Sequence, residues 1–168
     1  MRVFLDSPAY NPSASATLDS CSQNTATAVI KHQNGSLMNQ TTPISIQETF
    51  KKVKYLEGRT PETTDEEAKE SSEKLSDYRD GGVFIAHYSG NSEWERHSNG
   101  DELVQVIEGG TTLILLSDNN ETPHILKEGE LLVVPRNMWH RFETPKGVKV
   151  MTVTPQPTDH SIERPENA

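Results

Sequence analysis

Short apolar segments separated by turn residues fill the second half of this chain, and they limit the folds that it can adopt. Five such segments have the length and composition of β-strands, at 82–89, 102–108, 111–117, 130–135 and 148–155. Polar triplets at 118–120 and 127–129 interrupt the series as hairpin turns do. Several short strands at this spacing predict an all-β antiparallel barrel or sandwich.

The composition shows that this β-rich part is joined to more polar segments. Hydrophobic residues make up 32% of the 168 residues and the mean hydropathy is −0.69, but the apolar residues concentrate after Gly81. We therefore expect one folded domain with extra segments. The expected parts are a polar arm at 1–43, a strand and a short surface helix within 44–81, a barrel at 82–156 and a polar tail at 157–168.

The segments before the barrel carry weaker patterns. The apolar run at 27–30 is long enough to pair as an edge strand, although a flexible arm explains it equally simply. Partial alternation from Ile44 to Leu56 predicts a strand. Thr63 and Glu66 have the spacing of a capping box, so the charged run DEEAKESSEKL is expected to form a short surface helix.

Charge and cysteine content exclude several classes of protein. The net charge is −9 and no basic block is present, which argues against nucleic acid as the main partner. No apolar run approaches the ~20 residues that span a bilayer. The amino terminus lacks the apolar stretch of a secretory signal, and the single Cys21 has no partner for an internal disulfide. A cytoplasmic protein with an incidental surface cysteine is therefore expected.

Three acidic and imidazole side chains lie close together in the run WERHSNGDELVQVIEGG. Glu95 and His97 are two residues apart, so an extended strand projects both from one face. The turn residues Asn99 to Asp101 follow, and Glu102 then begins a strand that returns toward His97. Two carboxylates and an imidazole converging in this way predict a site for a divalent metal.

This run and a later one resemble the two conserved motifs of the cupin superfamily. In the first motif, His97, Glu102 and Gly109 stand at the places of the second histidine, the glutamate and the glycine, while Glu95 stands where a histidine is usual. In the second motif, GELLVVPRNMWHRFE, the matching residues are Gly129, Pro135 and His140, with Asn137 replacing a glycine and Glu143 replacing a frequent asparagine. The resemblance covers about 83–154 and implies a small single-domain cupin, an antiparallel β-barrel of the jelly-roll or double-stranded β-helix type.

The resemblance also implies a ligand set for the metal. His97, Glu102 and His140 would form a core of two histidines and one carboxylate, and Glu95 would be a fourth ligand, an acid–base group or the partner of a neighbouring arginine. One divalent ion per chain is expected, and Fe(II), Mn(II), Ni(II) and Zn(II) all suit these donors. The alternative is that His97 and His140 are ordinary hydrogen-bonded strand histidines. Asn137 is a mild change, because Asn tolerates a positive φ.

Four further residues are candidates for the lining of the cavity. These are His87, Val104, Trp139 and Phe142. For His87 and Phe142 a core position is the simpler interpretation, and for Trp139 it is packing at the barrel mouth. Arg96 has the opposite strand parity to Glu95 and His97, so it is expected to face outward.

The family allows two functions. The first is a metal-dependent enzyme, with a dioxygenase-type reaction ahead of isomerase, lyase or hydrolase chemistry, acting on a small polar or organic-acid molecule. The second is a non-catalytic module that binds or senses a small ligand. By the same resemblance we expect a homodimer, to which the polar arm could contribute an exchanged strand.

Overall fold

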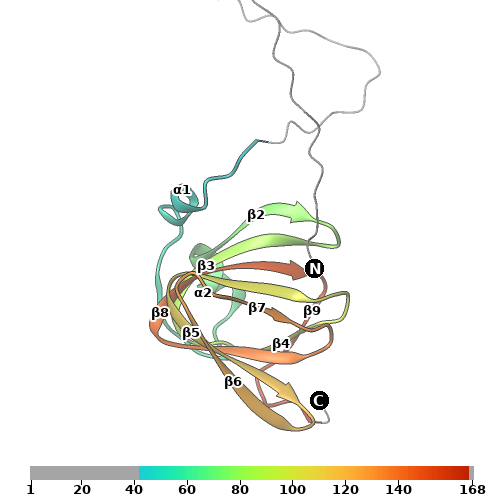
Figure 1. The fold of residues 1–168 in the computed structure, drawn as a ribbon. Helices are drawn as coiled ribbons and strands as arrows, with labels where there is room; N and C mark the ends of the chain where they lie inside the picture. The colour runs from blue at the N-terminus through green and yellow to red at the C-terminus, as the bar shows by residue number, and fades with distance from the viewer. Residues whose placement is uncertain (1–41, 167–168) are drawn as a thin grey trace, which may run out of the picture. The chain divides into compact units, whose positions relative to one another are not determined.

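The computed structural model describes residues 42–166. These residues form an all-β fold with two short helices and one 3₁₀ turn (Figure 1). The predicted fold class is therefore confirmed. The strands are β1 (Leu56–Arg59), β2 (Ser72–Tyr78), β3 (Gly81–Asn91), β4 (Trp94–His97), β5 (Glu102–Ser117), β6 (Asn120–Lys127), β7 (Leu131–Val134), β8 (Trp139–Pro155) and β9 (Thr158–Ser161). The helices are α1 (Ile46–Phe50), α2 (Asp65–Ala68) and the 3₁₀ turn η1 (Lys69–Ser71). Cys21, the run at 27–30 and nearly all of the arm at 1–43 lie outside the described residues.

Two long strands, β5 and β8, connect the parts of the barrel. They pair with each other along most of their length, and β8 also pairs with β3 and, near its start, with β4. The first part of β5 pairs with β7 and its last part with β6. All pairs in the described residues are antiparallel except β1 with β3, which is parallel.

The segments 102–108 and 111–117 were predicted as two strands, but they form the single strand β5. Gly109 has φ +80, and an added Cβ there would lie 2.5 Å from the backbone oxygen of Gly147. The glycine pair therefore bends one continuous strand between the two layers instead of ending it. The turn predicted at 118–120 is confirmed, because Asp118 and Asn119 both have positive φ, as a two-residue hairpin turn requires.

The strand predicted from Ile44 to Leu56 is wrong over most of its length. Ser45 caps helix α1 by accepting a hydrogen bond from the backbone N–H of Glu48. Ile46 and Phe50 are four residues apart, so the helix turns both toward Ile85 and the outer face of β3. The strand β1 begins only at Leu56.

The predicted surface helix is shorter and begins one residue later than expected. Its capping box joins Thr64 to Glu67, and α2 ends at Ala68. From Ser72 the chain forms β2, because pairing with the edge of β3 outweighs the helical propensity of that run. The tail at 157–168 also differs from expectation, since Thr158–Ser161 forms β9 against β4.

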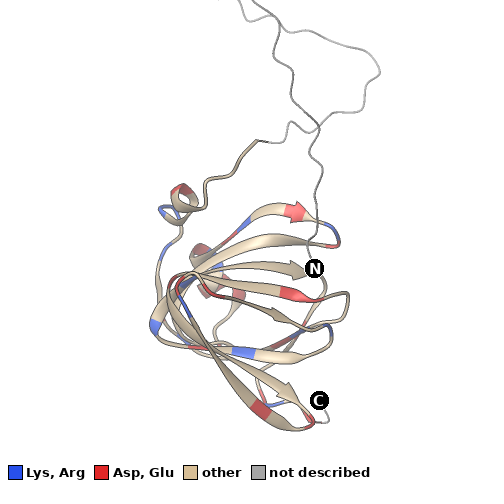
Figure 2. Ribbon diagram, in the orientation of Figure 1, with Lys and Arg blue, Asp and Glu red and all other residues tan. Residues whose placement is uncertain are grey.

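Strand parity divides the apolar side chains into an interior and an outer set. The interior cluster includes Tyr88, Val104, Val106, Leu113, Phe142 and Val150. An outer cluster joins α1 to Ile85, and a second outer cluster joins Trp94 to Ile114 and Leu116. Basic residues are scattered among acidic ones along the described ribbon (Figure 2). No helix within 42–166 is long and apolar enough to cross a membrane.

Candidate metal centre

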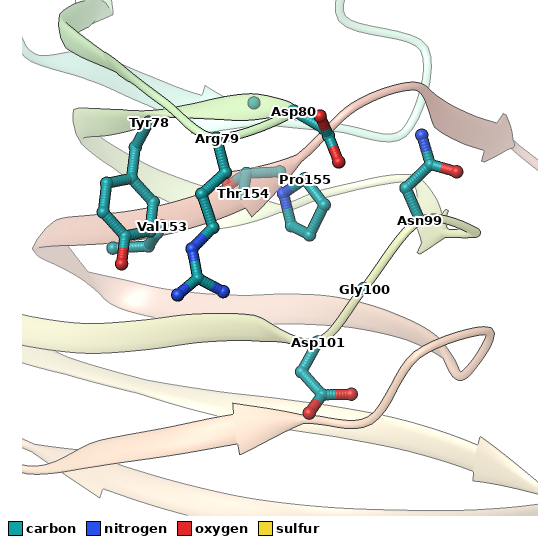
Figure 3. Close-up of a pocket in the computed structure, with 10 residues that line it drawn as sticks. Tyr78, Arg79, Asp80, Asn99, Gly100, Asp101, Val153, Thr154 and Pro155 are labelled. Atoms are coloured by element: carbon teal, nitrogen blue, oxygen red, sulfur yellow. The ribbon is translucent and has the colours of Figure 1, made fainter.

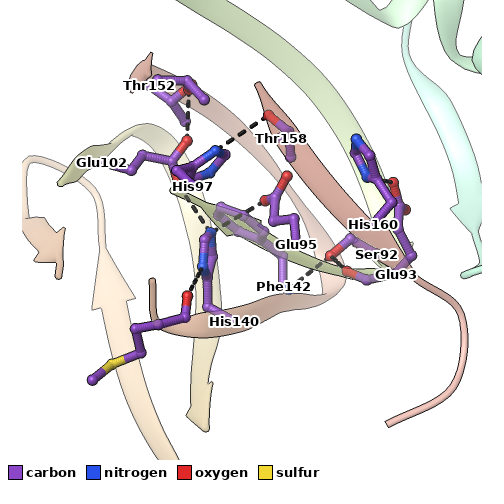
Figure 4. A network of polar contacts seen from close by, with 12 residues as sticks. Ser92, Glu93, Glu95, His97, Glu102, His140, Phe142, Thr152, Thr158 and His160 are labelled. Atoms are coloured by element: carbon purple, nitrogen blue, oxygen red, sulfur yellow. Dashed lines mark hydrogen bonds and ion pairs between the residues drawn. The ribbon is translucent and has the colours of Figure 1, made fainter. Parts of the chain in front are cut away.

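Four side chains from three strands converge inside the barrel (Figure 4). Glu95 and His97 point inward from β4, as their two-residue spacing predicted. Glu102 is the first residue of β5, and His140 is the second residue of β8. Glu95 is the ladder partner of His140, so strand pairing itself places these two side chains next to each other.

The donor atoms of this cluster lie within a few ångströms of one another. Glu95, His97 and His140 each offer one ligand atom, and these atoms all lie within 4.8 Å of each other. The Glu102 Oε2 atom lies 2.9 Å from His140 Nε2 and 3.4 Å from His97 Nε2. The structure therefore brings together all four residues that the sequence proposed as ligands.

The two rings each keep one nitrogen for a hydrogen bond and turn the other inward. His140 Nδ1 lies 3.1 Å from the carbonyl oxygen of Met138, which makes that nitrogen the donor. His97 Nδ1 lies 3.2 Å from the hydroxyl of Thr158. Partners on the outer nitrogen orient a metal-binding histidine, so both Nε2 atoms face the two carboxylates, where His140 Nε2 contacts Glu102.

One of these inner nitrogens, His97 Nε2, lacks a hydrogen bond and makes only a 3.4 Å contact with Glu102 Oε2. His97 is 3% exposed, and its Nε2 is one of only two buried side-chain nitrogen or oxygen atoms without a hydrogen-bond partner in the described part of the chain. Buried polar atoms are normally paired, so an orphaned imidazole nitrogen facing carboxylates is typical of a ligand position. The donor set therefore fits a divalent cation.

Glu102 and His140 form a buried acid–imidazole pair. Burial by itself lowers the pKa of His140, but hydrogen bonds to Glu102 and Glu95 outweigh it and raise that pKa to about 10. Burial raises the pKa of Glu102, and the hydrogen bond with His140 and the 3.4 Å contact with His97 more than reverse this, so the carboxylate stays ionised. Without a metal, a proton on His140 supplies the positive charge that the pair needs.

Neighbouring residues fix the orientation of the cluster. Thr154 Oγ1 donates to Glu102 Oε1 at 2.6 Å and is itself 2.6 Å from the hydroxyl of Thr152. Asn137 has φ +65, and its backbone N–H donates to the carbonyl of His97. Asn137 thus adopts the positive φ for which the family uses glycine, and it ties the start of β8 to the end of β4.

The predicted cavity residues divide into two pairs. Val104 and Phe142 belong to the interior cluster, and the Phe142 ring lies 6.2 Å from the His140 ring. Trp139 lies on the outer face beneath the Arg96 guanidinium, at 4.6 Å, which also confirms that Arg96 faces outward. His87 lies on the outer face of β3, 4.8 Å from the Tyr55 ring, so it does not line the interior.

Thr154 also borders a surface pocket of about 280 Å³ at the end of the barrel. The turn between β2 and β3 forms one side of this pocket, and the loop at 99–101 forms the other (Figure 3). Neither Thr154 nor Thr158 was a candidate from the sequence, because Thr154 lies near the far end of β8 from His140 and Thr158 lies on β9, outside both motifs. Only the even spacing of Thr152 and Thr154 on β8 could have suggested that both face inward.

Comparison with known proteins identifies the family. Residues 82–154 match the family Cupin_2, described as a cupin domain. This part of the chain is a cupin domain. The matched residues contain all four members of the cluster, and their bounds agree closely with those expected from the two motifs.

Two relatives and one solved structure illustrate how far this cupin resembles known proteins. It is 30% identical over 83 residues to the uncharacterized protein L612 of Acanthamoeba polyphaga mimivirus, covering 45% of this chain and 51% of that protein. It is 29% identical over 73 residues to the uncharacterized protein YdbB of Bacillus subtilis (strain 168), covering 44% of this chain and 62% of that protein. The matches thus span less than two thirds of either relative. The crystal structure of protein NMB1881 from Neisseria meningitidis shares the fold, with a TM-score of 0.51, 16% identity, and coverage of 68% of this chain and 100% of that one.

Proposed function

We propose that this cupin binds one divalent metal ion through His97, His140, Glu102 and Glu95, and acts as an enzyme on a small polar or organic-acid molecule. The observation that carries the proposal is the orphaned Nε2 of His97, buried against the Glu102 carboxylate and beside His140. Two neutral imidazoles and two carboxylates would balance the charge of a divalent ion. Fe(II), Mn(II), Ni(II) and Zn(II) all accept this donor set.

Glu95 has a different environment from the other three residues. Its side chain is 21% exposed, whereas those of His97, Glu102 and His140 are at most 3% exposed. Glu95 therefore lies between the buried donors and solvent, where it can give a proton to a ligand or take one from it. Whether it also ligates the ion depends on the direction of its carboxylate when a ligand is bound.

The interior of the barrel supports chemistry shielded from water. Phe142 and Val104 pack around the cluster, and both are buried. A bound divalent ion would supply Lewis-acid chemistry or, where it is redox-active, electron transfer. We place a dioxygenase-type reaction first, because two histidines and one carboxylate are the donor set of non-haem iron oxygenases.

A second candidate function is a non-catalytic module that binds or senses a small ligand. It is favoured by the direct hydrogen bond between His140 and Glu102, through which these two residues satisfy each other without a metal. The replacement of a usual histidine by Glu95 points in the same direction. A homodimer and a cytoplasmic location, both expected from the sequence, stay predictions.

Elemental analysis of protein purified without added metal separates the two functions. A redox-active ion at one equivalent per chain, lost in His140→Ala, supports the enzyme. Protein without metal, in which His140→Ala leaves small-ligand binding unchanged, supports the module. His87→Ala is the matched control, because His87 lies on the outer face of β3 and should leave the metal content unchanged.

A further inference from the structure

The second buried orphan atom of the described residues is the Nε of Arg59. Arg59 lies close enough to Glu95 for the two charges to interact. The Arg59 guanidinium also lies over the ring of Tyr88, which belongs to the same interior cluster as Phe142, the neighbour of His140. A buried donor without an acceptor is unfavourable, so the position is suited to an acceptor that comes from a ligand.

Arg59 is held firmly in this position. It ends β1, where its ladder partner on β3 is Gly90 with φ +102. An added Cβ on Gly90 would lie 2.1 Å from the backbone oxygen of Arg59, so only glycine allows the two strands to approach this closely. The hydroxyl of Ser89 also accepts a hydrogen bond from the backbone N–H of Gly58, at 3.0 Å.

The guanidinium group is oriented by two further contacts. It lies 5.0 Å from the centre of the Tyr88 ring, which belongs to the interior cluster. Its Nη2 donates to Glu93 Oε2 at 2.8 Å. Glu93 is shared, because its other oxygen lies 3.2 Å from Nδ1 of His160 (Figure 4). One carboxylate therefore faces two basic side chains.

We infer that Arg59 binds a carboxylate group of the small molecule that this cupin takes up, with the rest of the molecule directed toward Glu95 and the two inner histidines. The inference rests on the proposed function and narrows its ligand to a carboxylate-bearing compound. A guanidinium presents its N–H groups in a planar fork that matches a carboxylate, and a carboxylate is acceptor-only. In this inference Arg59 contacts the small molecule and does not coordinate the metal ion.

Acetate and its neutral isostere acetamide are suitable probes. With arginine labelled by ¹⁵N, the Nε–H resonance of Arg59 should shift saturably on addition of acetate to the zinc-loaded protein, and acetamide should bind at least about tenfold more weakly, as expected from the loss of one charge-assisted hydrogen bond. Acetate binding is compared across the variants by isothermal titration calorimetry, and Arg59→Gln should lose this binding. Arg96→Gln should keep it, because Arg96 carries the same charge but pairs with Asp159 on the outer face.

Two additional measurements keep the test decisive. Arg59→Gln leaves Glu93 without its partner, so the double variant Arg59→Gln/Glu93→Gln removes both charges and should also lose acetate. Equal binding of acetate by wild type and either variant, or equal binding of acetate and acetamide, would overturn the inference and leave Arg59 as a counter-charge to Glu93.

Zinc titration of the same proteins tests the metal centre separately, since Arg59→Gln should bind zinc as wild type does. If wild type binds no zinc, the proposed function fails, and the acetate titration on metal-free protein still decides the role of Arg59.

Discussion

At the residue scale, the central feature is a pair of buried ionisable groups that need either a proton or a cation. Glu102 is 2% exposed and His140 is fully buried, yet they are in direct hydrogen-bond contact. Removing one partner from such a pair leaves an uncompensated charge, which typically costs ~3–5 kcal/mol. A proton and a divalent metal are therefore competitors for the same imidazole nitrogen.

The stability of the metal-free protein should depend on pH on both sides of an optimum. The folded pKa of His140 is raised above its ordinary 6.5, so its contribution is complete below pH 6.5 and is lost as the pH rises toward about 10. The folded pKa of Glu102 is lowered below its ordinary 4.5, so its contribution is complete above pH 4.5 and is lost as the pH falls. Urea unfolding of chelator-treated protein should give maximal stability between pH 4.5 and 6.5. Stability that stays constant from pH 6.5 to 9.5 would refute a protonated His140.

Thr154 should matter through a single hydrogen bond. Its hydroxyl donates to Glu102 Oε1 at 2.6 Å, so Thr154→Val leaves a buried carboxylate oxygen without a donor. We expect a loss of ~1–3 kcal/mol in the free energy of unfolding, measured by urea denaturation. Thr154→Ser keeps the hydroxyl and should retain more of the stability than Val does. Equal losses in both variants would show that the methyl group, and not the hydrogen bond, is responsible.

At the scale of the elements, glycines set how closely strands approach each other. Gly58 and Gly90 both have positive φ, but an added Cβ meets nothing within 4 Å at Gly58 and meets the Arg59 backbone at Gly90. Gly58→Ala should cost ~1–2 kcal/mol from backbone conformation alone. Gly90→Ala should cost a further ~1–3 kcal/mol from the clash and should displace β1. Thermal and urea unfolding of the two variants compare these costs, and similar losses would contradict a close approach of β1 to β3.

The elements also show which patterns a sequence can reveal. The strands of the barrel were predictable, because their apolar residues alternate and polar turns separate them. Helix α1 was not, because Ile46 and Phe50 fit a helix as well as a partly alternating strand, and only packing on Ile85 decides between the two. Strand β6 was missed because it contains Pro123, which is tolerated there since, among the described strands, β6 pairs with β5 alone. Strand β9 depends wholly on pairing with β4.

At the scale of the whole molecule, the two motifs were enough to predict the fold and the convergence of the four side chains. The spacing within the first motif determines which side chains converge, because alternate positions on β4 and the turn at 99–101 bring Glu95, His97 and Glu102 together. Arg59 could not be predicted in the same way. It comes from β1, outside both motifs, and lies over Tyr88 because β1 pairs in parallel with β3.

The expected homodimer can be tested through the exposed strand β7. Strand β7 pairs only with β5 among the described strands, and its Leu131 and Val133 side chains are 52% and 47% exposed. A second subunit that covers this edge would bury them. We expect a dimer by sedimentation velocity at micromolar concentration, and Val133→Glu should shift it toward the monomer. A wild-type protein that sediments as a monomer would contradict the prediction.

The most direct test of the account is a titration of metal-free protein with Co(II), followed by visible absorption. We predict saturation at one equivalent per chain for the wild type and for His87→Gln, whose substitution lies on the outer face of β3. His97→Gln and His140→Gln should each bind at least about tenfold more weakly, because each loses a nitrogen donor. Co(II) binding by the wild type should also weaken at lower pH, because a proton competes with the metal for His140. Equal saturation in all four proteins, or no saturable binding by the wild type, would contradict a metal centre in this barrel.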